Sequence, residues 1–107
     1  MIHPSKILIV DDDPCDVDLL ELEDLGYTTV SASNGCEALE KVAVEAPDLI
    51  LLDVMMPIMD GLTACRILKE DDETRLIPIV IMTGLDCFDD RIQGIEAGAD
   101  DFLTKRA

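Results

Sequence analysis

Short apolar runs that end abruptly in acidic residues alternate along this chain with stretches of helical spacing. Ile7–Val10 stops at three consecutive aspartates, Asp11–Asp13, and Leu49–Leu52 stops at Asp53. A strand reads as a continuous apolar run when both of its faces are covered, and its polar end marks where it reaches solvent. Parallel strands also need long crossover connections, usually helices, between them. The alternation therefore predicts a sheet of buried, parallel strands.

Turn and capping residues divide the rest of the chain. Gly26, Pro47 and Gly98 stand where helical patterns stop, Asn34 lies in a turn that leads into one, and Asp60 can cap another. The apolar or β-branched runs between these helices are candidate strands. We expect strands at 7–10, 27–32, 49–52, 77–82 and 101–105, and helices at 14–25, 38–46, 61–69 and 88–97.

Apolar spacing also predicts which side of the last helix faces the core. Phe88, Ile92 and Ile95 recur at helical intervals. We expect these three side chains to form the inner stripe of that helix.

The order of the elements predicts an α/β fold with a doubly wound, five-stranded parallel sheet. Strand and helix alternate throughout, so right-handed crossovers should place helices on both faces. A chain of 107 residues has room for one domain, which we place at 1–107. In such a sheet, ligands bind beyond the carboxyl ends of the strands, where the winding reverses.

The net charge of the chain limits the classes of partner that it can bind. The chain has 24 Asp and Glu against 8 Lys and Arg, a net charge of -16, which repels phosphate backbones and anionic lipid. The segment Met1–Lys6 lacks the apolar core of a signal peptide, and no apolar run approaches the roughly 18 residues of a membrane span. We therefore expect a cytoplasmic protein that binds neither nucleic acid nor membrane directly.

Polar residues at the strand ends form the candidate site. Asp11 and Asp12 follow the first expected strand, Asp53 the third and Thr83 the fourth, and Lys105 ends the fifth. Two carboxylates about 5 Å apart repel by about 3 kcal/mol at an effective dielectric constant of about 20, so a cation should offset them. Carboxylates without His or thiolate partners suit Mg²⁺, which takes one or two carboxylates, water and a substrate phosphate.

Asp53 can be the reacting group of this site. With a divalent ion present, an ionised carboxylate can attack phosphorus, as it does in aspartyl-phosphate enzymes. Lys105 and the Thr83 hydroxyl would stabilise the charge that develops on the phosphoryl oxygens. The residues themselves thus point to an aspartyl phosphate as the product.

Four segments carry a family resemblance. They are Ile-Val-Asp-Asp-Asp-Pro at 9–14, Leu-Leu-Asp-Val-Met-Met-Pro-Ile-Met-Asp-Gly at 51–61, Ile-Val-Ile-Met-Thr-Gly at 79–84 and Gly-Ala-Asp-Asp-Phe-Leu-Thr-Lys at 98–105. In this order they resemble the motifs of the response-regulator receiver domain, the phosphoacceptor module of two-component signalling. The resemblance implies a flavodoxin-like sheet with strand order 2-1-3-4-5. It also implies a phosphorylation-dependent switch with self-catalysed phosphorylation and dephosphorylation, not a metabolic enzyme.

The resemblance assigns metal ligands and a phosphoacceptor. Asp53 would accept the phosphoryl group from a histidine kinase phosphohistidine. Asp12 would bind Mg²⁺ directly, Asp11 mainly through water, and the backbone carbonyl of Met55 would complete the protein ligands. The partner implied is a sensor histidine kinase or a phosphotransfer protein.

The resemblance also assigns switch residues. The Thr83 hydroxyl would move toward the phosphoryl group, and Phe102 would be the aromatic residue whose rotation reports this movement. Lys105 would be the conserved cation of the family. Receivers usually have proline after this lysine, and Arg106 stands there instead, which leaves the orientation of the lysine open.

We expect the fifth helix, with which receivers usually end, to be absent from residues 1–107. Only two residues follow Lys105. Two explanations stay open. Either the chain is part of a longer protein, with an output domain beyond residue 107, or a partner replaces that helix, for example a second copy in a homodimer.

Two other protein classes are alternatives to the receiver domain. A haloacid-dehalogenase-like phosphatase would use Asp11 as nucleophile, because Asp11-x-Asp13 after a strand resembles that family's first motif. That family places its lysine before a final acidic pair, whereas Asp100-Asp101 precede Lys105 here, and 107 residues leave little room for a phosphatase core. A flavin-binding electron carrier of the same fold would need a phosphate loop after the first strand, where three acids would repel the phosphate.

Overall fold

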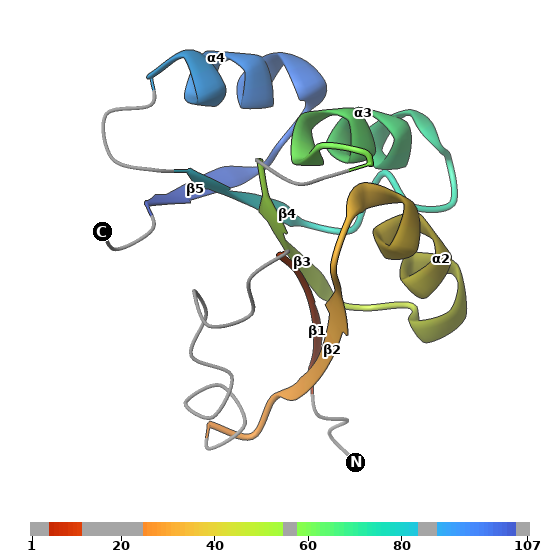
Figure 1. Ribbon diagram of the computed structural model, residues 1–107. Coiled ribbons are helices and arrows are strands. Elements are labelled where there is room, and N and C mark those ends of the chain that lie inside the picture. Colours follow the sequence, from red (N-terminus) through yellow and green to blue (C-terminus); the bar gives the residue numbers. More distant parts are fainter. Residues whose placement is uncertain (1–4, 12–24, 55–57, 84–87, 105–107) are drawn as a thin grey trace.

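A computed structural model describes residues 5–11, 25–54, 58–83 and 88–104 (Figure 1). In chain order it contains β1 (Lys6–Val10), β2 (Thr28–Ala32), α2 (Gly35–Glu45), β3 (Leu49–Asp53), α3 (Gly61–Glu70), β4 (Ile79–Thr83), α4 (Phe88–Ala97) and β5 (Asp101–Thr104). The helix expected at 14–25 lies outside the described residues, and every other expected element is present. Among the helices of the described part, none has the length and apolar character needed to cross a membrane.

The five strands form one parallel sheet in the order β2-β1-β3-β4-β5. This order confirms the flavodoxin-like fold that the sequence predicted. The chain winds toward β2 after β1 and in the opposite direction from β3 onward. The winding therefore reverses between β1 and β3, and a crevice is expected at the carboxyl ends of these two strands.

Side-chain caps begin two of the helices. The Asn34 carboxamide oxygen accepts a hydrogen bond of 2.9 Å from the Glu37 amide, and the Asp60 carboxylate accepts one of 2.8 Å from the Thr63 amide. Each cap satisfies an amide that has no partner inside its helix. Both helices start where the sequence signals lie, and the cap predicted at Asp60 is confirmed.

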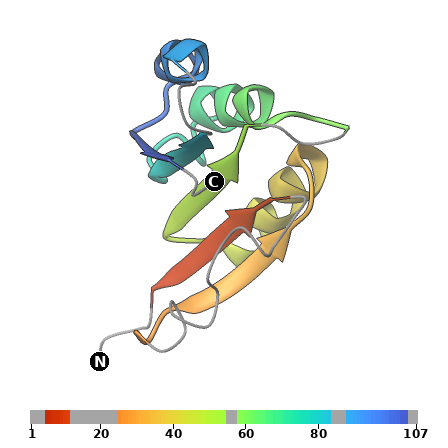
Figure 2. The same cartoon turned by 60° about the vertical axis from the view of Figure 1, so that its left-hand side comes forward.

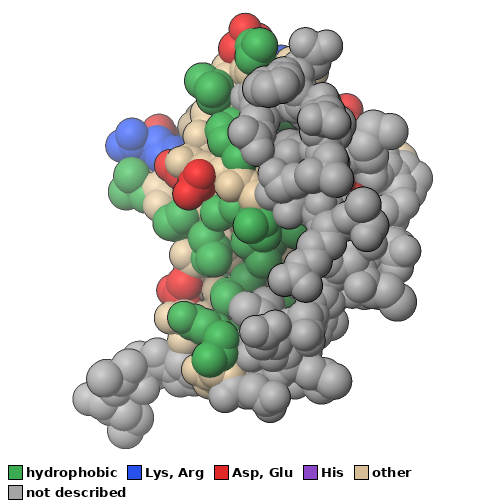
Figure 3. All heavy atoms as spheres, turned by 90° about the vertical axis from the view of Figure 1, so that its left-hand side faces the viewer, with side chains coloured by type: hydrophobic (Ala, Val, Ile, Leu, Met, Phe, Trp, Pro, Cys, Tyr) green, Lys and Arg blue, Asp and Glu red, His purple; other side chains and the backbone are tan. Residues whose placement is uncertain are grey.

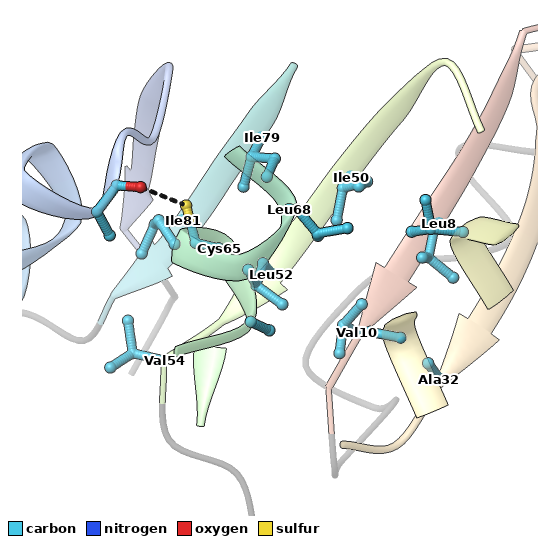
Figure 4. Packing of buried hydrophobic residues seen from close by; sticks show 14 residues of the cluster. Leu8, Val10, Ala32, Ile50, Leu52, Val54, Cys65, Leu68, Ile79 and Ile81 are labelled. Atoms are coloured by element: carbon cyan, nitrogen blue, oxygen red, sulfur yellow. Dashed lines mark hydrogen bonds between the residues drawn. The ribbon is translucent and has the colours of Figure 1, made fainter. Parts of the chain in front are cut away.

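The described helices all lie on one side of the sheet, where they cover the main core (Figures 1 and 2). Side chains alternate between the two faces of a strand, so every second strand residue points toward α2, α3 and α4. Figure 4 shows how these side chains meet those of α3. The largest fully buried side chains of this cluster are Leu8, Val10, Ile50, Leu52, Cys65, Ile79 and Ile81.

The alternate strand residues form a second apolar face, opposite the described helices. Ile7 and Ile9 of β1 are buried there, whereas Leu49 and Leu51 of β3 and Val80 of β4 are partly exposed. Figure 3 looks onto this side and shows hydrophobic side chains gathered between charged ones. The helix expected at 14–25 would be the first to cover this face, and the described residues do not test that expectation.

The orientation of α4 corrects one prediction. Ile92 and Ile95, expected on its inner stripe, are 55% and 65% exposed, while Gly94 and Ala97 are buried. Periodicity predicted the helix correctly but not its inner side. Close packing against the sheet selects the small side chains here, because the space beneath Gly94 is already filled by the ring of Phe102.

Candidate functional site

Two buried carboxylates form the centre of the candidate site. Asp11 is 4% exposed and Asp53 5%. Val10 of β1 is the register partner of Leu52 of β3, so one step further along both strands Asp11 lies beside Asp53. Neighbouring strands lie about 4.8 Å apart. The structure thus brings these two sequence-predicted residues to the same edge of the sheet, at the point where the winding reverses.

Backbone hydrogen bonds fix the position of Asp11. Its amide donates to the carbonyl of Ala32 at 3.0 Å, which extends the pairing of β1 with β2 by one residue. Asp53 is the last residue of β3 and pairs in register with Met82 of β4. The backbone of the sheet therefore holds both acids, and a sheet positions side chains more accurately than a loop does.

The backbone of Thr83 reaches the same edge. Thr83 is one residue beyond Met82, the partner of Asp53, and it pairs with Thr104 at the end of β5. Lys105 follows Thr104 directly but lies outside the described residues. The remaining predicted ligands, Asp12 and Met55, lie outside them too, so the register supports the grouping of Asp11, Asp53 and Thr83 alone.

Phe102 lies one layer behind this edge. It pairs in register with Ile81 of β4, and its half-buried ring packs against the main core under α4. The ring lies beneath Gly94 of α4, because a Cβ built at Gly94 would come within 2.6 Å of its Cε1. The ring of Phe102, the predicted switch residue, therefore points toward the core in this structure.

Glycine at position 61 is a site feature that sequence reasoning missed. The Gly61 amide donates to the Val54 carbonyl at 3.0 Å, and a Cβ at position 61 would overlap the carbonyl oxygen of Asp53. The β3–α3 loop can therefore close over the backbone of Asp53 only because residue 61 has no side chain. The available signal was the Asp60-Gly61 pair, which ends the segment 51–61 but does not by itself indicate a close approach to Asp53.

A second close approach anchors the other end of this loop. The Gly35 amide, at the start of α2, donates to the Met59 carbonyl at 3.0 Å. A Cβ at Gly35 would come within 2.7 Å of that carbonyl oxygen. Ile58 beside it has a left-handed backbone with φ of 69°, which β-branched residues rarely adopt. The described parts of this loop, at 54 and at 58–61, are therefore held by backbone hydrogen bonds and close contacts.

The donors at this edge fit Mg²⁺. Asp11 and Asp53 supply carboxylate oxygens, the hard ligands that Mg²⁺ prefers, and Mg²⁺ commonly takes one or two carboxylates and completes its shell with water and phosphate oxygens. Two neighbouring buried carboxylates also favour a nearby positive charge. Asp11 and Asp53 are therefore candidate ligands, and the described part of the chain holds no group of three or more His, Cys, Asp or Glu that could bind a metal ion.

Comparison with known proteins identifies the family. The model of the response regulator receiver domain matches residues 7–107. The chain belongs to this family of two-component signalling domains. It is 53% identical over 103 residues to the response regulator PleD of Caulobacter vibrioides and 46% identical over 103 residues to the Bacillus subtilis alkaline phosphatase synthesis transcriptional regulatory protein PhoP. These matches cover 94% of this chain but 23% and 42% of the two relatives, which are longer proteins.

Solved structures agree with this assignment. A putative response regulator from Chloroflexus aurantiacus is 36% identical, with a TM-score of 0.90, over 95% of this chain and 85% of that one. The receiver domain of the sensor histidine kinase PA1611 from Pseudomonas aeruginosa is 30% identical, with a TM-score of 0.85, over 98% and 88% of the two chains. That structure has a magnesium ion coordinated in its active site cleft. Receiver domains bind Mg²⁺ in this site and act as signalling domains.

Proposed function

We propose that this chain accepts a phosphoryl group from the phosphohistidine of a sensor histidine kinase or phosphotransfer protein, and that Asp53 is the acceptor. The observation that carries the proposal is the pair of buried carboxylates, Asp11 and Asp53, at adjacent strand ends in a chain of the receiver family. The family match supports the class of reaction. The burial of Asp53 at the end of β3 supports its role as the nucleophile.

The transfer is a displacement at phosphorus. A carboxylate oxygen of Asp53 forms the new P–O bond, the P–N bond of the phosphohistidine breaks, and its electron pair leaves with the imidazole nitrogen. The product is a mixed anhydride between Asp53 and phosphate. Lys105 and the Thr83 hydroxyl are proposed to stabilise charge on the phosphoryl oxygens, with positioning and electrostatics supplying the catalysis.

Acidic residues at the same edge are proposed to hold Mg²⁺. Asp11 and Asp53 are the described ligands, with Asp12 and the Met55 carbonyl as the proposed remainder. When bound, Mg²⁺ offsets the negative charge of the carboxylates and the incoming phosphoryl group. Asp11 itself is proposed to bind Mg²⁺ mainly through water, as the resemblance to receiver domains implies.

The proposed output is a changed partner-binding surface, with Thr83 and Phe102 as the switch residues. The domain is placed at 1–107 and in the cytoplasm, and it is proposed to act without direct nucleic-acid or membrane contact because of its net charge of -16. Since PleD and PhoP extend well beyond the matched region, an output domain after residue 107 is part of the proposal. A homodimer is the alternative arrangement.

Incubation with Mg²⁺ and a small acyl phosphate tests the acceptor. Intact mass spectrometry should find one added phosphoryl group, which hydroxylamine removes, and Asp53→Asn should abolish it. Asp60→Asn is the matched control, because it makes the same carboxylate-to-amide change in an exposed cap of the neighbouring loop. Asparagine also caps helices well, so this control should fold and react normally.

The same experiment separates the phosphatase alternative, in which Asp11 is the nucleophile. That mechanism requires Asp11→Asn to lose all covalent phosphoryl chemistry while Asp53→Asn keeps it. The proposal expects the reverse order: Asp11→Asn slows labelling through weakened Mg²⁺ binding, and Asp53→Asn stops it. An adduct that persists in Asp53→Asn contradicts the proposed acceptor.

A further inference from the structure

Among the described side chains of α4, the large apolar ones face solvent and the small ones face the sheet. Ile92 and Ile95 are 55% and 65% exposed, whereas Gly94 and Ala97 are buried. An amphipathic helix normally buries its larger apolar residues, because burial removes more apolar area from water. Some other group must therefore fill the space between α4 and the sheet.

That group is the ring of Phe102. A Cβ built on Gly94 would lie 2.6 Å from Cε1 and 3.2 Å from Cζ of this ring, and 3.6 Å from Cγ1 of Ile81. Real Cβ atoms do not approach other atoms as closely as the first of these distances. The ring edge thus occupies the position that the side chain of any other residue at 94 would need.

Nothing in the backbone of Gly94 requires glycine. It lies inside α4 and is absent from the described glycines with positive φ, which are Gly26 and Gly98. Glycine in a helix interior is less favourable than alanine because it restricts the unfolded chain least. The chain accepts this cost at a position of α4 where Phe102 makes contact, so the contact is the physical reason for the glycine.

We infer that Gly94 is a positioning residue that provides the space for the inward ring of Phe102 and thereby sets the outward presentation of Ile92 and Ile95. A side chain at position 94 would not fit beside the ring of Phe102 in its present position. Either the ring leaves its place against Ile81, or α4 moves away from β4. In both cases the surface formed by α4 and the neighbouring β5 changes. The inference rests on the proposed function only for the statement that this change has a role in signalling.

Nuclear magnetic resonance of the natural chain tests the geometry directly. The chain has two phenylalanines, Phe88 and Phe102, so ring labelling gives few signals, and Phe88→Leu assigns them. Without any phosphoryl donor, ring protons of Phe102 should show cross-relaxation to the α protons of Gly94 and to Ile81. Gly94→Ala should weaken the contact of the ring either with Ile81 or with residue 94, and should shift the ring signals. Gln93→Ala, an exposed neighbour in α4, should leave both unchanged.

Stability measurements give an independent test, because the effect of Gly94→Ala on the denaturation midpoint should change sign when the ring of Phe102 is removed. In the natural chain, Gly94→Ala should lower the denaturation midpoint because its methyl group meets the ring. In a Phe102→Ala background the same substitution should raise the midpoint, because alanine favours helix and the ring is gone. An equal increase in both backgrounds would overturn the inference, as would a folded Gly94→Ala protein in which the contacts of the Phe102 ring with both Ile81 and residue 94 are unchanged.

Phosphorylation then tests the link to signalling. Mass spectrometry reports whether Asp53 is labelled, and the ring signals report whether Phe102 leaves Gly94. If no label forms, the proposed function fails while the positioning role of Gly94 is judged by the donor-free experiments. If Asp53 is labelled and the ring signals stay unchanged, the signalling role of the Gly94–Phe102 contact is wrong. Labelling together with loss of the ring contacts supports both.

Discussion

The ammonium group of Lys69, near the end of α3, lies 2.6 Å from Oδ2 of Asp100, directly before β5. Lys69 also donates to the backbone carbonyls of Arg75 and Ile77, at 3.1 and 2.8 Å. The same oxygen of Asp100 accepts the amide of Ile79 at 2.9 Å. This ion pair therefore joins α3, the loop after it, β4 and the start of β5. It lies at the amino-terminal ends of these strands, opposite the candidate site at Asp11 and Asp53.

Replacing Asp100 should destabilise the fold. Asp100→Asn removes the ion pair and weakens the acceptor for two donors, so we expect a loss of about 1–2 kcal/mol in the free energy of unfolding. The value is modest because the Asp100 side chain is 48% exposed and solvent screens its charge. Chemical denaturation measures the change. Asp72→Asn is the control, because its 3.7 Å pair with Arg75 is highly exposed and should contribute almost nothing.

The same carboxylate should give stability a pH dependence. Burial raises the pKa of Asp100, but the hydrogen bonds from Lys69 and Ile79 and the charge of Lys69 outweigh it and hold the pKa below its ordinary value of 3.8. A carboxyl with a lowered pKa contributes stability above its unfolded-state pKa and loses it as the pH falls through the folded-state value.

The difference in unfolding free energy between the natural chain and Asp100→Asn should therefore be constant from about pH 8 to pH 5 and shrink below about pH 4. Comparing the two proteins cancels the titration of the other acids. Denaturant titrations over a pH series provide the measurement. A difference that grows in acid would show that Asp100 is not stabilised as its charged form.

Closing the loop over Asp53 should depend on Gly61. Gly61→Ala places a methyl group against the Asp53 backbone carbonyl, which cannot rotate away as a side chain could. We expect a loss of about 2–3 kcal/mol in stability, together with slower labelling by an acyl phosphate. Arg66→Ala, at an exposed position of the same helix, should change neither. A Gly61→Ala protein with natural stability and labelling rate would contradict the close approach.

Two cysteines should differ strongly in reactivity. Burial raises the pKa of the Cys65 thiol to about 11, and its Sγ lies 3.7 Å from the Ala97 carbonyl, whereas Cys36 is exposed. The thiolate is the reactive form, so iodoacetamide at pH 8 should modify Cys36 readily and Cys65 only on unfolding. Peptide mass spectrometry in a Cys15→Ser, Cys87→Ser background tests this. Equal rates for both thiols in the folded chain would contradict the packing of Cys65.

Magnesium should stabilise the folded chain. Mg²⁺ binds the native carboxylates and not the unfolded chain, so it should raise the melting temperature at neutral pH. The increase should disappear in Asp12→Ala and shrink in Asp11→Asn, while Asp60→Asn should keep it. Differential scanning calorimetry with and without the ion measures the shift. An undiminished shift in Asp12→Ala would show that Asp12 is not a ligand.

Much of the architecture could be predicted because each element carries its own signal. The buried run before Asp53 and the cap at Asp60 depend on residues that are near one another in the chain. The alternation of strand and helix then limits the sheet to parallel topologies, whose strand ends meet at one edge. For that reason Asp11 and Asp53, 42 positions apart, could be assigned to one site before their register was known.

The inner side of α4 could not be predicted in the same way. Its periodicity favoured Ile92 and Ile95, but the depth available under the helix depends on the ring of Phe102, which comes from a later strand. The pairing of Lys69 with Asp100 likewise joins residues 31 positions apart that carry no shared pattern.

The amino-acid sequence by itself thus determined the elements that the structure describes, their parallel arrangement and the acidic strand ends, because local spacing and capping encode them. The strand order followed from the resemblance to the receiver family. Only the tertiary structure decided which side of α4 is buried, why Gly61 and Gly94 have no side chain, and where Lys69 finds its partner. These features depend on the volume left between elements once they pack together. Close-packed interiors leave no room for a misplaced methyl group, and a one-dimensional pattern does not contain that volume.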